Sequence, residues 1–574
     1  MVRPGVNDRH AGYLSAISRN TLERREHGRL GLMSKRNSES GGLRQGRGSW
    51  QSLSALLSRR TFLRRAALVS GGLLASGLGI GGWLAVARHA PPRPQGAKPN
   101  IILLTADSLR ADHVGAYGYA RPTTPNLDRL AAESVLFEYA FAPTSYTGPS
   151  LASLHTGKYI MEHFMAYKNG DSLYHHTDPT LAALLQAHGC QTAAFVSNFI
   201  LERKRSQMDK GFMHYDDTLP EKQEERSEVV ASRSAAMTTS AALQWLKTRA
   251  KPPFFLWVHY NEPHGPYTPP PPYDTMFLND SLYLAERRLL ELSPEQMAGK
   301  LFAKDAREDG TKVTPKLVNY LQRKRGADGK VLWYNPRVAD QIALYDGEVR
   351  SLDESIHQLL QALKARGLYD TSWLLFSSDH GESLGEGGFY FVHGYRATLE
   401  LLRVPLLIKP PGKPLPRRIS TQVSTVDIMP TLLQALGIER PQGISGQPFL
   451  SLLRGEREDG PRHVFSEFGY QYSQIDDQHQ LLIGYDGPTS TKMGLKQVKF
   501  EFDRIPVSLF AYRRDPLGQR DLAGAEPRAA EARFLDFRSF LKDYFRRAAQ
   551  AVRVRRPATP ETAKSRAILK ELGY

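Results

Sequence analysis

Hydrophobic and polar positions alternate in blocks over the middle of the chain, and each block predicts one element. Apolar runs without polar alternation predict buried strands, and they lie at 101–104, 191–197, 253–260, 372–378 and 403–411. Amphipathic segments predict helices, and they lie at 123–134, 179–189, 234–249, 341–367 and 427–437. Because strands and helices alternate, the pattern predicts an α/β fold with a large, mostly parallel sheet flanked by helices on both faces.

This alternation breaks in two places. A run of four prolines followed by polar residues predicts a partly helical insertion at 268–340, beside the active face. Near the C-terminus, β-like segments separated by turn residues predict a small antiparallel sheet, and they lie at 480–486, 495–503 and 507–516. An amphipathic helix and a basic tail follow. We therefore expect a catalytic domain at 98–455 and a C-terminal subdomain at 460–574.

The N-terminal region differs from the rest of the chain in charge. Residues 1–65 carry +10 of the formal net charge of +17, and the body shows no basic patch interleaved with aromatic residues. Nucleic acid is therefore not expected as a partner. We expect residues 1–57 to form a disordered basic extension.

A targeting segment is expected at 58–90. Arg59 and Arg60 precede an uncharged stretch at 66–87, which is typical of a twin-arginine export signal. The stretch is also long enough to attach the protein to a membrane, so a cleaved signal and an anchor both stay open. Either way, we expect an exported protein, periplasmic or anchored to the membrane and facing the periplasm or exterior.

Polar residues follow two of the predicted strands. Asp107 comes shortly after the run at 101–104, and Asp379 and His380 come directly after the run at 372–378. Because the carboxyl ends of parallel strands line one crevice, these residues are expected to converge there. Two carboxylates and an imidazole suit a divalent metal ion, although each aspartate taken alone could simply cap a helix.

Thr147 lies just before a predicted helix start at Gly148, Pro149 and Ser150. A helix N-terminus offers backbone N–H groups to an anion. Coordination to a metal ion would lower the pKa of the threonine hydroxyl and turn it into a nucleophile for phosphorus or sulfur. The alternative is that Thr147 only caps the helix.

Seven segments resemble, in order, the blocks of the sulfatase family within the alkaline-phosphatase-like superfamily, and they lie at 98–134, 147–157, 259–267, 345–356, 377–394, 401–412 and 424–438. The resemblance covers Pro99 to Leu453, and residues 509–524 resemble the family's C-terminal subdomain. It implies an alkaline-phosphatase/sulfatase-like sandwich with a small C-terminal antiparallel-sheet subdomain.

The resemblance also implies roles for individual residues. Metal ligands would be Asp107, Thr147, Asp379 and His380, with Thr147 also at the nucleophile position. His264 matches a residue that contacts the transferred anion, and His393 matches a position near the leaving group. His259 is a further candidate for substrate binding behind them. Each histidine could instead be an ordinary core residue.

The chain also departs from the family pattern. Thr147 and Leu151 stand where the family has the Cys or Ser that becomes formylglycine and the arginine that assists it. Ser108 replaces a second aspartate ligand, and a cationic pair is absent around Asn198, which could still donate a hydrogen bond to substrate. A threonine nucleophile resembles the envelope phosphotransferases of the same superfamily.

Three functions follow from these observations. The first is an exported, metal-dependent hydrolase or transferase that acts on phosphate or sulfate esters through Thr147. The second is a true sulfatase, and the third is a catalytically silent relative that binds an envelope glycan or lipid. We expect one divalent ion (Mn, Zn, Mg or Ca) and a small-molecule, glycan or lipid-headgroup ester as substrate. Asp353 and His357 are interpreted as an ordinary surface pair rather than a second metal site.

Overall fold

The computed structural model describes residues 98–554, with longer gaps at 221–231, 281–321 and 485–505 and shorter gaps at 164, 169–170, 174–178, 279, 326–330, 335–337, 387–389, 414–415, 459 and 470. The expected N-terminal extension and export signal lie outside the described residues. Within the described part of the chain, no helix combines the length and apolar character needed to cross a bilayer.

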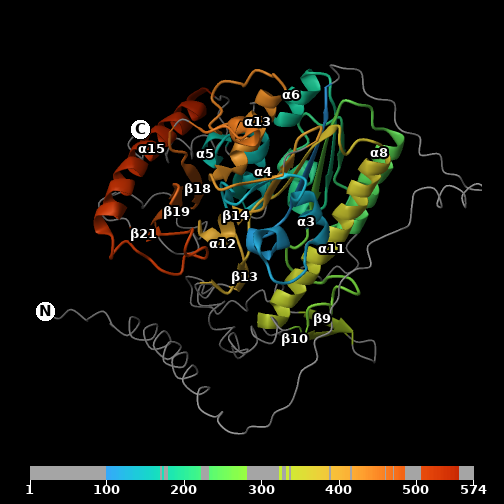
Figure 1. Ribbon diagram of the computed structural model, residues 1–574, viewed down its shortest axis with the longest axis horizontal. Helices are drawn as coiled ribbons and strands as arrows, with labels where there is room; N and C mark the ends of the chain where they lie inside the picture. The colour runs from blue at the N-terminus through green and yellow to red at the C-terminus, as the bar shows by residue number, and fades with distance from the viewer. Residues whose placement is uncertain are drawn as a thin grey trace, which may run out of the picture. The chain divides into compact units, whose positions relative to one another are not determined.

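An eight-stranded sheet forms the centre of the fold (Figure 1). Its strands, in spatial order, are β16 (Arg417–Ile419), β2 (Val135–Phe137), β15 (Leu406–Lys409), β11 (Ser372–Ser378), β1 (Asn100–Ala106), β8 (Phe254–Tyr260), β6 (Gln191–Val196) and β7 (His214–Asp216). Only β15 runs against the others, because it pairs antiparallel with both β11 and β2. The expected mostly parallel α/β sheet is therefore confirmed.

Helices cover both faces of this sheet, as the apolar strands require. In β1, Ile101 and Leu103 share a core with the helices on one face, while Ile102 and Leu104 point to the other. The first face carries α4 (Thr147–Thr156), α6 (Leu181–Ala187) and α13 (Ile428–Ala435). The second carries α3 (Pro125–Ala131), α8 (Ala235–Thr248) and α11 (Val338–Ala365), and Figure 1 shows α8 and α11 side by side.

The apolar run at 403–411 differs from its expected single strand. It is divided at Pro405 into β14 (Arg403–Val404), which pairs with β3 (Ala140–Phe141), and β15, which enters the central sheet. A proline has no N–H to donate to a strand ladder, so the pairing changes at this position.

The C-terminal part contains the expected small antiparallel sheet. Its strands are β18 (Val464–Phe468), β19 (Gln471–Ile475), β20 (Gln480–Gly484) and β21 (Val507–Phe510). The long amphipathic helix α15 (Pro527–Val554) packs on it through an aromatic cluster that includes Phe465 and Phe537. The strand expected at 495–503 lies outside the described residues.

The insertion expected at 268–340 is described only in part. Turns cover 271–278, and β9 (Gln322–Arg325) forms an antiparallel hairpin with β10 (Val331–Tyr334). The helical content expected for this insertion appears only where α11 begins, at Val338, in the part that the structure describes.

The interpretation of Asp353 and His357 as a surface pair is wrong. Asp353 is completely buried in α11 and caps a neighbouring helix. Its carboxylate accepts hydrogen bonds from the backbone N–H of Asn126 at 3.1 Å and of Leu127 at 2.8 Å, at the start of α3. Helix periodicity did not show this contact, because the partner residues lie more than 200 positions away.

This arrangement predicts unequal roles for the two residues in stability. Asp353→Ala should lower the free energy of unfolding by about 1–3 kcal/mol, because buried N–H groups of α3 lose their acceptor. His357→Ala, one turn along the same helix, should change it by less than about 0.5 kcal/mol. Urea unfolding of both variants tests this, and equal losses would contradict the capping role.

Candidate active site

Three potential metal ligands lie at the carboxyl ends of two adjacent strands. Asp107 follows β1 and Asp379 follows β11, which pair in parallel so that their last residues are in register. His380 comes next in sequence, and one ligand atom from each of the three residues lies within 4.8 Å of the others. All three side chains are buried. The expected convergence of these residues is what the structure shows.

The orientation of His380 suits a metal ligand. Its Nδ1 lies 2.8 Å from the carbonyl oxygen of Gly381, which can only accept, so Nδ1 carries the proton. The lone pair of Nε2 therefore points toward the carboxylates, 3.6 Å from Asp379 Oδ2 and 3.9 Å from Asp107 Oδ1. Fixing the tautomer through the second ring nitrogen is the usual arrangement for a metal-bound histidine.

The electrostatics of the cluster also fit a cation. Burial, and then the charge of Asp107, raise the pKa of Asp379 well above its ordinary value. Burial, and then His393, lower the pKa of His380 to about 3, which keeps its imidazole neutral. Asp379 Oδ2 is buried without a hydrogen bond of normal geometry among the described residues. A divalent cation would satisfy this oxygen and remove the repulsion between the carboxylates.

Thr147 is the first residue of α4 and points into the same cluster. Its Oγ1 lies 3.3 Å from His380 Nε2 and 3.5 Å from Asp107 Oδ2. Tyr146 occupies the N-cap position, and no side chain caps this helix. The alternative that Thr147 only caps the helix is therefore wrong, and its hydroxyl shares the space of the metal ligands.

Asn198 and His259 both contact Asp107. The Asn198 amide donates to Asp107 Oδ2 at 2.6 Å, while its oxygen accepts from the N–H of Ile200. His259 Nδ1 lies 2.9 Å from Thr105 Oγ1, and its Nε2 lies 3.7 Å from Asp107 Oδ2. The sequence predicted that both side chains bind substrate, and in the structure both also contact Asp107, a potential metal ligand.

Histidines also set the charge state of Asp107. Burial alone would raise the pKa of this carboxyl group, but His264, His259 and His380 outweigh burial and lower it.

Two further histidines form one side of the site. The rings of His380 and His393 lie 4.5 Å apart between centroids, and those of His393 and His264 lie 4.9 Å apart. His264 donates through Nδ1 to the carbonyl oxygen of Gly265 at 2.6 Å, which leaves Nε2 to face a ligand. The structure thus brings His259, His264, His380 and His393 together around Asp107.

Glu382 is a site residue that the sequence reasoning missed. Its Oε1 lies 3.0 Å from His393 Nδ1, and its Oε2 accepts a hydrogen bond from the hydroxyl of Tyr267 at 3.2 Å. Burial would lower the pKa of His393, but the charge of Glu382 raises it. The sequence feature that could have identified Glu382 is its position two residues after His380, within the same loop.

Ser108 and Tyr345 position the two carboxylates. The Ser108 hydroxyl donates to Asp107 Oδ1 at 3.0 Å, and its N–H donates to Asp379 Oδ1 at 3.0 Å. Ser108 has a left-handed backbone with φ of 65°, which is unfavourable for a residue with a side chain. The Tyr345 hydroxyl, on α11, donates to the Ser108 carbonyl at 2.8 Å and accepts from Arg110 N–H at 3.1 Å.

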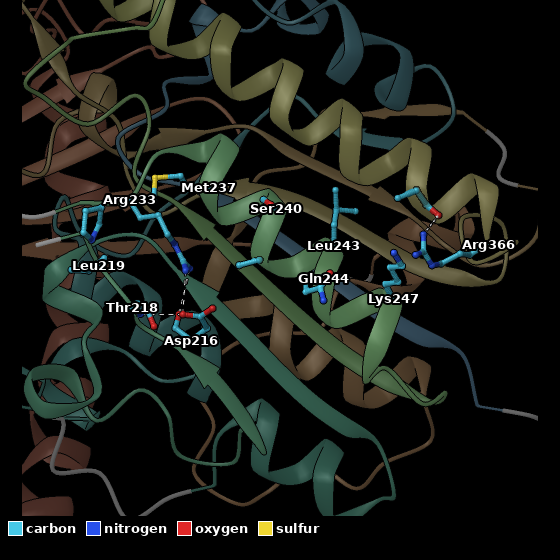
Figure 2. Close-up of a pocket in the computed structure, with 13 residues that line it drawn as sticks. Asp216, Thr218, Leu219, Arg233, Met237, Ser240, Leu243, Gln244, Lys247 and Arg366 are labelled. Carbon is cyan, nitrogen blue, oxygen red and sulfur yellow. Dashed lines mark hydrogen bonds and ion pairs between the residues drawn. The ribbon is translucent and has the colours of Figure 1, made fainter.

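One cavity of the described chain lies away from this site. A cavity of about 930 Å³ lies on the outer side of α8, between the end of β7 and the end of α11 (Figure 2). Figure 2 shows the Arg233–Asp216 ion pair at one end and Lys247 and Arg366 at the other. None of the converging aspartates and histidines lines it, so volume is a poor guide to the chemistry here.

Comparison with known proteins decides the family. The sulfatase family profile matches residues 99–438, more than half of the chain. The protein belongs to the sulfatase family. A second profile, described as N-sulphoglucosamine sulphohydrolase, C-terminal, matches residues 388–532 of this sulfatase-family protein.

Individual relatives of this sulfatase-family protein have different names. It is 26% identical to the multifunctional alkaline phosphatase superfamily protein PehA of Trinickia caryophylli, over 76% of this chain and 93% of the relative. It is also 26% identical to an N-acetylglucosamine-6-O-sulfatase of Bacteroides thetaiotaomicron, over 77% and 86%. The phosphonate monoester hydrolase of Agrobacterium radiobacter shares the fold, with a TM-score of 0.57, 21% identity and coverage of 79% and 96%.

The positioning role of Tyr345 predicts an effect on metal affinity. Tyr345→Phe should weaken the binding of a divalent ion by about 10- to 100-fold. The substitution removes the hydrogen bond that holds Ser108, and Ser108 in turn orients both carboxylates. Isothermal titration calorimetry with Mn²⁺, Zn²⁺, Mg²⁺ or Ca²⁺ measures this directly.

Tyr369→Phe is the matched control. Its hydroxyl donates to Glu133 at 2.7 Å, so removing it should leave the affinity for the ion unchanged. Unaltered affinity in Tyr345→Phe would refute the positioning role.

Proposed function

We propose that this sulfatase-family protein is a metal-dependent enzyme that cleaves or transfers phosphate-type esters, with Thr147 as its nucleophile. The observation that supports it is the position of the Thr147 hydroxyl, within 3.5 Å of both Asp107 and His380 at the start of a helix. A hydroxyl among metal ligands is a competent nucleophile for phosphorus.

The proposed chemistry divides among the residues of the site. A divalent ion held by Asp107, Asp379 and His380 would lower the pKa of the Thr147 hydroxyl and neutralise charge on the transferred group. His264 presents Nε2 to the anion, since its Nδ1 is bound to Gly265. His393, whose pKa is raised by Glu382, carries the proton that the leaving oxygen needs. Asn198 and Ser108 orient Asp107.

The preference for a phosphate-type ester rests on the two substitutions in α4. Threonine is a secondary alcohol and does not give the aldehyde of formylglycine. Leu151, at the position of the assisting arginine, is completely buried in the apolar core beside α4, where a guanidinium has no polar partner. The name of the phosphonate monoester hydrolase, which shares this fold, agrees with a phosphorus ester as substrate, and the name of PehA assigns that relative to the alkaline phosphatase superfamily.

Hydrolysis of a sulfate ester is the second candidate. It is favoured by the N-acetylglucosamine-6-O-sulfatase relative and by the match to the C-terminal region of a sulphohydrolase. These names also suggest a glycan as the carrier of the ester. A catalytically silent binding protein is the weakest alternative, because the three potential ligands and the Thr147 hydroxyl lie together and buried.

The place of action is a separate proposal. Arg59, Arg60 and the uncharged stretch at 66–87 support export by the twin-arginine route, followed by cleavage or by retention as an anchor. Such export carries folded proteins, which suits an enzyme that binds its ion before it leaves the cytoplasm.

The nucleophile is tested by substitution. Thr147→Ala should reduce turnover by about three orders of magnitude or more, because the covalent step is lost. Thr147→Ser keeps a hydroxyl and should retain much of the activity. The assay is a panel of nitrophenyl phosphate, phosphodiester, phosphonate and sulfate esters with Mn²⁺, Zn²⁺, Mg²⁺ or Ca²⁺. Undiminished activity of Thr147→Ala would exclude the covalent mechanism, and activity on sulfate alone would establish the second candidate.

The acid role of His393 predicts a dependence on the leaving group. His393→Asn should lower the rate by about 10²- to 10⁴-fold for an alkyl ester, whose leaving oxygen needs a proton. The loss should be much smaller for a nitrophenyl ester, since nitrophenolate leaves without one. His188→Asn, an exposed histidine after α6, is the control. Equal losses for both esters would show that His393 has another role.

A further inference from the structure

A second cavity lies far from the metal ligands. It has a volume of about 530 Å³ and forms where the loop at 443–447, strand β18 and helix α15 meet. Its wall includes Tyr159, three residues beyond the end of α4. Because α4 has ten residues, this end lies about 15 Å from Thr147 at its start. The volume is within the roughly 300–1,000 Å³ of small-ligand pockets.

One wall of this cavity is aromatic and rigid. Phe465 lies 5.0 Å from the ring of Tyr159 and 5.0 Å from the ring of Phe540, between centroids. Phe540 is also stacked on Tyr544 at 6.2 Å with nearly parallel rings. Phe465 is buried, whereas Phe540 is only half-buried and lines the cavity. The cavity therefore offers an apolar face that is fixed before any ligand arrives.

A buried carboxylate joins the three segments around the cavity. Glu162 Oε1 accepts hydrogen bonds from the Ser445 hydroxyl at 2.7 Å and from Arg547 Nε at 3.1 Å, and its Oε2 accepts from the N–H of Tyr159. Glu162 is only 4% exposed. This connection fixes the guanidinium of Arg547 at the rim of the cavity.

The cavity lining also includes polar groups with unused hydrogen-bonding capacity. His463 Nδ1 is buried without a hydrogen-bond partner in the described chain. The side chains of Gln447 and Ser539 also line the cavity, and no hydrogen bond within the described residues engages them. The Asp536 carboxylate accepts only a long bond, 3.5 Å, from Gln474.

The chemistry of the cavity lining excludes several classes of ligand. An apolar ligand would leave the buried nitrogen of His463 and the surrounding polar groups unsatisfied. A simple anion would face Asp536, and a simple cation would face Arg547. The lining instead combines donors, acceptors and an aromatic face, as a compact polyhydroxylated molecule requires.

We propose that this cavity is a non-catalytic binding site for a neutral saccharide. One apolar ring face would pack on Phe540, and hydroxyl groups would bond to Asp536, Gln447, Ser539 and His463. The site would hold a glycan away from the metal ligands, and it does not depend on which ester Thr147 attacks.

Binding of unsulfated disaccharides to the full chain tests the proposal. Cellobiose, maltose, lactose and N,N′-diacetylchitobiose would be titrated by calorimetry and by ligand-observed NMR. At least one should bind, and both Asp536→Asn and Ser539→Trp should weaken it by about 10-fold or more. Both positions are exposed on α15, so the fold does not depend on them.

Two controls separate this site from the catalytic one. Leu535→Trp places the same bulky side chain on α15 at a position that is 55% exposed and outside the cavity, and it should bind saccharide normally. Thr147→Ala should also bind saccharide normally, and Ser539→Trp should hydrolyse nitrophenyl esters at the unmodified rate. The proposal is overturned if no disaccharide binds at millimolar concentration, if only sulfated or phosphorylated sugars bind, or if Thr147→Ala abolishes binding.

Discussion

The repulsion between two buried carboxylates is the constraint around which this molecule is organised. Asp107 and Asp379 meet at the ends of paired strands, where both side chains are buried. The protein arranges donors around them instead of separating them. Ser108 contacts both carboxylates, Asn198 contacts Asp107, and the N–H of His380 donates to Asp379 at 2.7 Å. Within the part of the chain that the structure describes, Asp379 Oδ2 has no hydrogen-bond partner, and it lies 3.6 Å from His380 Nε2.

The two faces of the sheet serve this cluster differently. On one face, α4 brings Thr147 to the ligands and places Leu151 in the core behind it. On the other face, α11 supports the strand ends through Tyr345 and caps α3 through Asp353. Thr147 and the tyrosine that supports the strand ends therefore come from opposite layers, on either side of the central sheet.

The longer central strands and the candidate metal ligands could be predicted because both depend on local patterns. Apolar runs marked β1, β6, β8 and β11, and polar residues directly after such runs marked Asp107, Asp379 and His380. Short strands such as β2, β7 and β16 were missed, because three residues give too little periodicity.

Contacts between distant segments could not be predicted from any local pattern. From the helix pattern, Asp353 is predicted to be exposed, and only the structure shows that it accepts hydrogen bonds from the N–H groups of Asn126 and Leu127. From the sequence, Asn198 is predicted to bind substrate, and only the structure shows that its amide donates to Asp107. Tyr345 and Glu382 were overlooked for the same reason, since each acts only through the residue it touches.

The left-handed backbone of Ser108 carries a consequence for how this chain can vary. Such a conformation costs a residue with a Cβ about 1–2 kcal/mol, which a glycine would avoid. A glycine, however, has no hydroxyl for Asp107. A glycine at position 108 would therefore stabilise the fold but leave the Asp107 carboxylate less precisely oriented, so stability and the arrangement of the site oppose each other at this position.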